Sequence, residues 1–216
     1  MTPIKIVFMG DSITAGQYVE TSKIWTSNVD RRLRAQFGEN TIATVNKGIT
    51  GETTRQGLER FPAAVQTERP DIVTIQFGLN DCNCWQTDEG LPRVSLRAYM
   101  ANLAEMIERS RRFGAREIIL MTNHRTLRRT PMVSGEVYED ASNRYSHAAR
   151  QVAQECGVTL CDQLFAFAPL TDGELNEMLL PPPDSLHLSE AGHVLYGDTL
   201  YPYLDAAINI SEAATA

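Results

Sequence analysis

Five short apolar runs, rich in β-branched residues, recur along the chain and predict buried β-strands. They occupy residues 4–9, 42–46, 72–77, 117–122 and 158–161. In the longer stretches between them, apolar residues recur at the three- and four-residue spacing of an amphipathic helix. One such set is Ile24, Trp25, Val29, Leu33 and Phe37. Strands that alternate with helices predict an α/β fold, in which a parallel sheet is covered by helices on both faces.

Capping residues indicate where two of these helices begin and end. Ser22 and Ser95 precede apolar periodic stretches and are predicted N-caps, because a serine side chain accepts a hydrogen bond from the first helical turn. Gly38 and Gly114 follow the same two stretches and are predicted to end them.

The last third of the chain is less regular than the rest. A helix is predicted over residues 140–156, and then Pro169 and the three prolines at 181–183 interrupt the pattern. A final helix is predicted from about 189 to 210. The chain has 216 residues, of which 43% are hydrophobic and 22% charged. This is typical of globular proteins and excludes fibrous and disordered classes, so a single domain over residues 1–216 is predicted.

Small and polar residues follow three of the predicted strands. The segments are Gly10-Asp11-Ser12, Asn46 to Gly51, and Gly78 to Asp81. In open parallel sheets, binding and catalytic residues lie beyond the carboxyl ends of the strands, so these segments are expected to meet at one edge. Much further along, the proline-rich break is followed by Asp184-Ser185-Leu186-His187.

Ser12 taken alone is more typical of a helix N-cap or a loop hydroxyl than of a nucleophile. A serine hydroxyl reacts at neutral pH only when a base takes its proton, and a histidine oriented by a carboxylate is the usual arrangement. Asp184 and His187, three residues apart in one loop, offer both groups. By itself that loop also fits a surface turn with a solvated aspartate.

Acyl transfer also needs hydrogen-bond donors for the oxyanion that develops on the carbonyl oxygen. The backbone N–H of Gly51 and the side-chain amide of Asn80 are candidate donors, because both lie in strand-end segments. A tight turn at Gly51 and a loop-capping amide at Asn80 are the alternatives.

Taken together, the four segments resemble the four sequence blocks of the SGNH hydrolase superfamily, also called GDSL esterases and lipases. They occur in the family order, and the resemblance extends from the first strand to the final helix. It implies a flavodoxin-like three-layer α/β/α sandwich with a five-stranded parallel sheet of order 2-1-3-4-5. The G-x-S-x-G motif of ordinary α/β-hydrolases is absent from the sequence, which disfavours that class.

The resemblance also implies the roles of individual residues. Ser12 would be the nucleophile, His187 the general base and then acid, and Asp184 the residue that orients His187. The backbone N–H groups of Ser12 and Gly51 and the side chain of Asn80 would form the oxyanion hole.

Four further residues are candidates for contact with the substrate. His124 and Arg125 follow the fourth predicted strand, and Arg125 or a neighbour is expected to bind an anionic or polyhydroxyl group, the alternative being a solvated loop. Trp85 is expected either to stack on a sugar ring or to anchor its own loop. Asp11 adjoins Ser12, although the family pattern gives this position a structural hydrogen bond.

The two remaining histidines, His193 and His147, both fall within predicted helices. His193 is close to His187 but falls inside the final predicted helix, which points to a structural role. His147 lies in the predicted helix over 140–156 and is expected to be structural or exposed.

The charge distribution limits the possible partners. The formal net charge is −7, and the basic residues are dispersed apart from short runs such as Arg31-Arg32. Such a chain repels phosphate backbones, so nucleic acid is not expected to bind. No apolar run reaches the roughly 20 residues of a membrane span, and the first predicted strand begins directly after Pro3. A cytoplasmic location is therefore expected.

The four cysteines are expected to be reduced thiols in that compartment. Their spacing matches neither a two-residue zinc knuckle nor a cysteine–histidine pattern, so no metal and no other cofactor is predicted. They are Cys82, Cys84, Cys156 and Cys161.

The leading hypothesis is a carboxylic-ester hydrolase that acts on a small-molecule ester through an acyl-serine intermediate. No long apolar lid is evident in the sequence, which favours short acyl groups such as acetyl, in particular on carbohydrates. The alternatives are an acyl thioesterase or lysophospholipase of the same superfamily, and a non-catalytic flavodoxin-like module that binds a ligand. The sequence does not indicate an oligomeric state.

Overall fold

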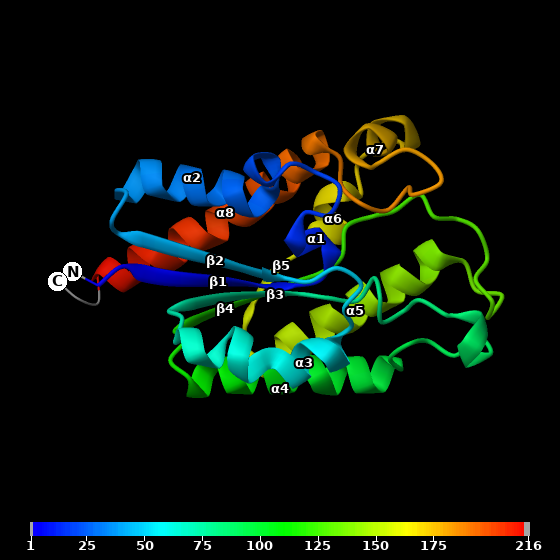
Figure 1. Ribbon diagram of the computed structural model, residues 1–216, viewed down its shortest axis with the longest axis horizontal. Coiled ribbons are helices and arrows are strands. Elements are labelled where there is room, and N and C mark those ends of the chain that lie inside the picture. Colours follow the sequence, from blue (N-terminus) through cyan, green and yellow to red (C-terminus); the bar gives the residue numbers. More distant parts are fainter. Residues whose placement is uncertain (1, 214–216) are drawn as a thin grey trace.

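A five-stranded parallel sheet lies at the centre of the molecule (Figure 1), and the computed structural model describes residues 2–213. The strand order is β2-β1-β3-β4-β5, as predicted. Each strand closely follows one of the predicted apolar runs. The strands are β1 (Ile4–Gly10), β2 (Ile42–Gly48), β3 (Ile72–Gln76), β4 (Glu117–Met121) and β5 (Thr159–Cys161).

Helices cover both faces of the sheet and complete the predicted three-layer sandwich (Figure 1). One outer layer contains α3, α4 and α5, with α4 in contact with both others. The opposite layer contains α2 and α8, which pack on each other. The bounds are α1 (Ser12–Ala15), α2 (Trp25–Phe37), α3 (Thr54–Ala64), α4 (Leu96–Arg112), α5 (Tyr138–Cys156), α6 (Gln163–Phe167), α7 (Asp172–Met178) and α8 (Glu190–Ala213).

Aromatic side chains fill the space between the sheet and each helical layer. On one face, the ring of Trp25 from α2 packs edge-on against Phe8 of β1, with ring centroids 5.1 Å apart, and also contacts Tyr196 of α8. On the other, Tyr99 of α4 and Tyr145 of α5 have centroids 5.0 Å apart. All five rings are fully or almost fully buried, so the two faces of the sheet share one continuous core.

Helix ends agree with the predicted capping residues in all but one case. Ser95 caps α4 by accepting a hydrogen bond from the backbone N–H of Ala98, and Gly38 follows α2. The prediction for Ser22 is wrong. This residue lies in a short 3-10 helix (Thr21–Lys23), and α2 begins at Trp25 after an extended Ile24 with no side-chain cap.

Two short helices occupy the segment that was predicted to be irregular. Asp162 caps α6 by accepting a hydrogen bond from the backbone N–H of Phe165. Thr171 and Glu174 form a reciprocal capping box at the start of α7. Both caps are encoded locally, but helices of five and seven residues are too short to show a clear periodicity.

The final helix begins where it was predicted to begin. The hydroxyl of Ser189 accepts a hydrogen bond from the backbone N–H of Gly192 and so caps the first turn of α8. Polar side chains line its contact with α2, including an ion pair of 3.0 Å between Asp198 and Arg32. Across residues 2–213, no helix combines the length and the apolar character that a membrane crossing requires.

Candidate active site

Ser12 lies directly beyond the carboxyl end of β1, the strand between β2 and β3. The last residue of β1, Gly10, is paired in register with Gly48 of β2 and with Gln76 of β3. The chain then turns sharply into α1, where the carboxylate of Asp11 accepts a hydrogen bond of 3.0 Å from the backbone N–H of Ile13. A β-carbon at Gly10 would lie 2.1 Å from the hydroxyl oxygen of Thr14, so only glycine fits this turn. Ser12 is thereby fixed at the end of β1, between the ends of β2 and β3.

The structure brings Ser12, His187 and Asp184 into one hydrogen-bonded row. Ser12 Oγ lies 3.0 Å from His187 Nε2, and His187 Nδ1 lies 2.7 Å from Asp184 Oδ2. When Nδ1 carries the proton and donates it to Asp184, Nε2 has a free lone pair directed at the serine hydroxyl. This is the geometry in which a histidine can act as a base toward serine.

The carboxylate of Asp184 is held from both sides of the loop that carries it. Its Oδ1 accepts hydrogen bonds from the backbone N–H groups of Leu186, at 3.0 Å, and His187, at 2.7 Å. Partial burial acts to raise the pKa of Asp184, but the backbone and ring hydrogen bonds from His187 outweigh it and lower the pKa below its ordinary value. Asp184 therefore stays ionised at neutral pH beside the imidazole.

The segment after β4 forms hydrogen bonds to the backbone of the loop that carries Asp184 and His187. His124 Nε2 lies 2.8 Å from the carbonyl oxygen of Leu186, and the backbone N–H of Leu127 donates to the carbonyl of Ser185. Arg128 Nε donates a hydrogen bond of 2.9 Å to the carbonyl of Asp184. Burial lowers the pKa of His124 to about 4, so this ring is neutral at pH 7 and acts as a hydrogen-bond donor.

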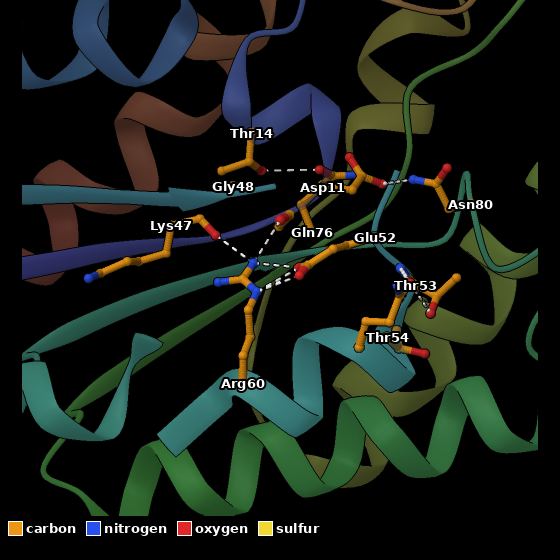
Figure 2. A network of polar contacts seen from close by, with 12 residues as sticks. Asp11, Thr14, Lys47, Gly48, Glu52, Thr53, Thr54, Arg60, Gln76 and Asn80 are labelled. Atoms are coloured by element: carbon orange, nitrogen blue, oxygen red, sulfur yellow. Dashed lines mark hydrogen bonds and ion pairs between the residues drawn. The ribbon is translucent and has the colours of Figure 1, made fainter. Parts of the chain in front are cut away.

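The two candidate oxyanion donors lie in the loops that follow β2 and β3. Gly51 has a φ of +77°, a conformation that favours glycine even though a β-carbon there would meet no other atom within 4 Å. Figure 2 shows the amide of Asn80 pointing toward Asp11, with Nδ2 at 3.5 Å from Asp11 Oδ2. Both loops thus reach the end of β1 where Ser12 begins α1.

Two buried carboxylates lie behind the candidate oxyanion donors. Burial is the main cause that raises the pKa of Asp11 to about 7 and the pKa of Asp81 to about 6. Asp81 accepts hydrogen bonds from the backbone N–H of Thr54, at 3.0 Å, and from the Thr54 hydroxyl. It thereby ties the loop after β3 to the first turn of α3.

An ion pair fixes the backbone immediately after Gly51. In Figure 2, Arg60 extends from α3 to Glu52, and its Nε lies 2.8 and 2.7 Å from the two carboxylate oxygens. Its Nη2 donates to the backbone carbonyls of Lys47, at 2.7 Å, and of Gly10, at 3.4 Å. One guanidinium therefore joins the ends of β1 and β2 to the loop that carries Gly51.

Loss of this guanidinium should destabilise the protein. Arg60→Met leaves the buried carboxylate of Glu52 unpaired, which should lower the free energy of unfolding by about 3 kcal/mol and the melting temperature by about 6–12 °C. Thermal unfolding followed by circular dichroism measures this shift. The matched control is Arg109→Met, because the ion pair of Arg109 with Glu105 is an exposed pair within one helix. Equal shifts in the two variants would contradict a special role for Arg60.

The four residues predicted to contact substrate each make contacts within the protein. Asp11 and His124 are buried and bonded to their own surroundings, so neither side chain faces solvent. The guanidinium of Arg125 bonds to the carbonyl of Leu170 at 2.6 Å and to Asp172 at 2.7 Å, joining the segment after β4 to α7.

Trp85 is partly exposed, at 49% of its surface, and its ring stacks on the guanidinium of Arg93 at 4.2 Å. Trp85 therefore anchors its loop on one face of the ring. This contact fits the expectation that Trp85 anchors its own loop.

Sequence patterns did not single out one residue that lies directly against the histidine. The ring of Tyr18 packs edge-on against His187, with centroids 5.2 Å apart, and 69% of its surface is exposed. Its φ is +71°, a strained value for a residue with a side chain. Tyr18 and Arg128 line an open depression of about 520 Å³ that adjoins Asp184. A tyrosine six residues after Ser12 carries no local signal of this position.

The remaining histidines differ in burial, and the cysteines are not paired in disulfides. His193 is buried in α8, where its Nδ1 accepts a hydrogen bond from the backbone N–H of Trp25, and burial lowers its pKa to about 4. His147 is exposed on α5. The cysteines are free thiols, and burial raises the pKa of both Cys82 and Cys161 above the ordinary value.

A parallel α/β/α sandwich with a serine, a histidine and an aspartate aligned beyond the carboxyl end of β1 defines a class of hydrolase folds. Comparison with known proteins identifies which family is involved. A model of the GDSL-like Lipase/Acylhydrolase family matches residues 8–195. The chain therefore belongs to that family.

The proteins that this chain resembles include an esterase and a lipase/acylhydrolase. The chain is 29% identical to an acetylxylan esterase from Geobacillus stearothermophilus, over 88% of this chain and 89% of that protein. The crystal structure of a lipase/acylhydrolase from Enterococcus faecalis superposes with a TM-score of 0.76 at 29% identity, covering 94% of this chain and 95% of the other.

Esterase TesA from Pseudomonas aeruginosa is 32% identical over 53% of this chain, but the match spans only about half of that relative, 52% of its length.

Proposed function

We propose that this protein is a serine-dependent carboxylic-ester hydrolase that acts through an acyl-serine intermediate. The observation that carries the proposal is the hydrogen-bonded row of Ser12, His187 and Asp184, with distances of 3.0 and 2.7 Å. Membership of the GDSL-like Lipase/Acylhydrolase family, together with the similarity to an acetylxylan esterase, supports it. The packing of α8 on α2 also supports a single domain for residues 1–216.

In the acylation step, Ser12 Oγ attacks the ester carbonyl carbon while its proton passes to His187 Nε2. The carbonyl π-bond opens and places negative charge on the oxygen. When that bond re-forms, the C–O bond to the alcohol breaks, and the imidazolium donates its proton to the departing oxygen. Asp184 stabilises the imidazolium through the 2.7 Å contact with Nδ1 and keeps its own negative charge.

In the deacylation step, a water molecule takes the place of the alcohol. His187 Nε2 removes one proton from the water as its oxygen attacks the acyl carbon. The bond between that carbon and Ser12 Oγ then breaks, and the proton returns to the serine oxygen. The carboxylic acid leaves and the enzyme regains its starting state, so no cofactor enters the balance.

The oxyanion of both steps is proposed to accept hydrogen bonds from the backbone N–H groups of Ser12 and Gly51 and from Asn80 Nδ2. The N–H of Ser12 belongs to the first turn of α1, where backbone N–H groups have no helical partner. Donors fixed in advance stabilise the charge without reorganisation when it forms.

Removal of one proposed donor tests this assignment. Asn80→Ala should lower kcat on p-nitrophenyl acetate by about 100-fold or more, with a smaller change in KM, because the amide bonds most strongly to the charged intermediate. Steady-state kinetics measures both constants. Asn176→Ala, at an exposed position on α7, is the matched control and should leave both unchanged. Full kcat in Asn80→Ala would remove Asn80 from the oxyanion hole.

For the substrate, we propose a short acyl group, acetyl in particular, carried by a carbohydrate. A relative named acetylxylan esterase that aligns over nearly its whole length supports this choice. The exposed ring of Tyr18 beside His187 also supports it, since an aromatic face and a neighbouring arginine suit a polyhydroxyl group.

A substrate panel tests the proposed specificity. Acetylated xylo-oligosaccharides, acyl-CoA thioesters and p-nitrophenyl esters of graded chain length would be compared by kcat/KM. We expect the two-carbon acyl group to be preferred among the p-nitrophenyl esters and the acetylated sugars to exceed the thioesters. Preference for long-chain or thioester substrates would instead favour lysophospholipase or thioesterase activity, which the matching Escherichia coli relative carries in its name.

A further inference from the structure

The two side donors of the proposed oxyanion hole come from strands that are not neighbours. Gly51 follows β2 and Asn80 follows β3, and these strands flank β1 on opposite sides (Figure 1). Sheet hydrogen bonds therefore fix each loop relative to β1 but leave the distance between the loops to side chains. A donor displaced by 1 Å loses most of its effect on an oxyanion, so this distance matters for catalysis.

Arg93 joins the two loops directly. Its Nη1 donates a hydrogen bond of 3.0 Å to the backbone carbonyl of Gly51 and one of 3.3 Å to Asn80 Oδ1. Its Nη2 donates to Gln56 Oε1 at 3.4 Å, which adds the first turn of α3 to the same cluster. One planar guanidinium thus contacts both proposed donor residues.

The backbone around Arg93 is itself anchored. The N–H of Arg93 donates a hydrogen bond of 2.9 Å to the carbonyl of Asn83, and the N–H of Val94 donates one of 3.1 Å to the carbonyl of Asp81. Trp85 stacks on the guanidinium at 4.2 Å and shields its face from solvent. The backbone hydrogen bonds of residues 93 and 94 and the stacked ring of Trp85 therefore fix the position of the guanidinium.

Arg93 also determines which way the Asn80 amide points. A guanidinium has only donors, so it pairs with the amide oxygen and excludes the flipped arrangement, in which the Asn80 NH2 group would face it. Nδ2 is thereby directed away from Arg93 and toward Asp11, at the end of β1. Donation to Oδ1 also withdraws electron density from the amide, which makes its N–H groups stronger donors.

The hydrogen bonds of Arg93 go to uncharged groups, although the negative charges of Asp81 and Asp88 lie close enough to act to raise its pKa against the effect of burial. Its three acceptors are two amide oxygens and one backbone carbonyl, all of them neutral. Arginines elsewhere on the surface, such as Arg109, instead pair with a carboxylate. The positive charge of Arg93 next to the proposed donors offsets the negative charge of Asp81, which would otherwise oppose an oxyanion there.

We propose that Arg93 is a positioning residue of the oxyanion hole: it holds Gly51 and Asn80 at a fixed separation and orients the Asn80 amide toward the reacting carbonyl. This inference rests on the proposed ester-hydrolase function. It does not require Arg93 to touch the substrate.

Arg93→Met keeps the length and much of the packing of the side chain but removes the donors. We expect kcat on p-nitrophenyl acetate to fall about tenfold or more, with KM within about twofold. Arg93→Lys should recover part of the loss, since one ammonium can bond to one of the two loops but not bridge both in a plane. Arg55→Met is the matched control, because Arg55 lines the same surface hollow as Arg93 and lies exposed on α3.

A double-mutant cycle with Asn80→Ala separates positioning from general stability. If Arg93 acts through Asn80, most of the effect of Arg93→Met on kcat should disappear in the Asn80→Ala background. A loss of the same size in both backgrounds, or an unchanged kcat in the folded Arg93→Met variant, would overturn the inference. If Arg93→Met fails to fold by circular dichroism, Trp85→Leu, which removes only the cover, decides: the inference requires a lower kcat.

The test distinguishes this inference from the proposed function on which it rests. If the wild-type protein neither hydrolyses p-nitrophenyl acetate nor reacts with a fluorophosphonate probe, the ester-hydrolase function itself is wrong. If the wild-type protein does both and the Arg93 variants keep full kcat, only the role of Arg93 is wrong.

Discussion

Replacement of Ser12 by alanine should abolish ester hydrolysis while the fold stays intact. We expect kcat to fall by on the order of 10⁴-fold or more, because no other group can form the acyl intermediate and only transition-state binding by the remaining residues is left. The side chain is 4% exposed and the change removes one oxygen atom, so the melting temperature should move by only a few degrees. Turnover of p-nitrophenyl acetate and thermal unfolding measure the two effects.

Covalent labelling tests directly whether Ser12 is the nucleophile. A fluorophosphonate probe should label the wild-type protein at Ser12 and leave Ser12→Ala unlabelled, as read by mass spectrometry. Ser134→Ala, at an exposed position far along the chain, is the matched control and should label normally. Wild-type protein that never labels at Ser12, or a Ser12→Ala variant with substantial turnover, would exclude the acyl-serine mechanism.

The sheet and its order could be predicted because their signals are local or follow from the family resemblance. The run Ile4 to Met9 reads as a strand from its β-branched composition alone, and the structure extends β1 by only one residue, to Gly10. Residues at the carboxyl ends of parallel strands share an edge whatever their loops do. That rule predicts from the sequence that Ser12, Gly51 and Asn80 lie at one edge of the sheet.

The same rule predicts where the backbone at a strand end lies, but not where its side chains point. The segment after β4 shows this difference. His124 and Arg125 do follow a strand end, as the rule requires. The ring of His124 is nevertheless buried against Phe167 and Tyr196, and Arg125 finds an acidic partner in α7, 47 residues away. Such pairings depend on how distant elements pack, and a strand-end position alone does not encode them.

Tyr18 and Arg93 could not be predicted for a related reason. Each lies in a connecting segment whose conformation is set by contacts with other loops, such as the stack of Trp85 on Arg93. Neither residue belongs to a periodic pattern, and neither is adjacent to a catalytic candidate in the sequence. Loops that carry function are positioned by the scaffold, so their side-chain geometry becomes visible only in three dimensions.

The proposed catalytic machinery is supported by two kinds of contact with different consequences. The pair of Glu52 and Arg60 is an ion pair, so its loss should appear mainly in stability. Arg93 bonds to neutral acceptors, so its loss should appear mainly in kcat. Measurement of both quantities for both variants therefore separates the residues that hold the loops in place from those that aim the donors.

Replacement of His187 by alanine should be nearly as severe as loss of the serine. Ser12 Oγ then has no base at 3.0 Å to take its proton, and the departing alcohol has no acid, so kcat should fall by on the order of 10⁴-fold. The two changes act on one chemical step, and the double variant Ser12→Ala/His187→Ala should be no less active than either single variant. Steady-state kinetics of the three proteins measures this non-additivity.

A second histidine provides the control for the His187 variant. His147→Ala, at an exposed position on α5, should keep wild-type kcat and KM. His193 does not serve this purpose, because its Nδ1 accepts a hydrogen bond from the backbone N–H of Trp25 and its loss would disturb the packing of α8 on α2. A folded His187→Ala protein that keeps a tenth or more of the wild-type kcat would mean that another group removes the proton from Ser12. Since burial lowers the pKa of His124 to about 4 and its Nε2 is already bonded to Leu186, that group would not be His124.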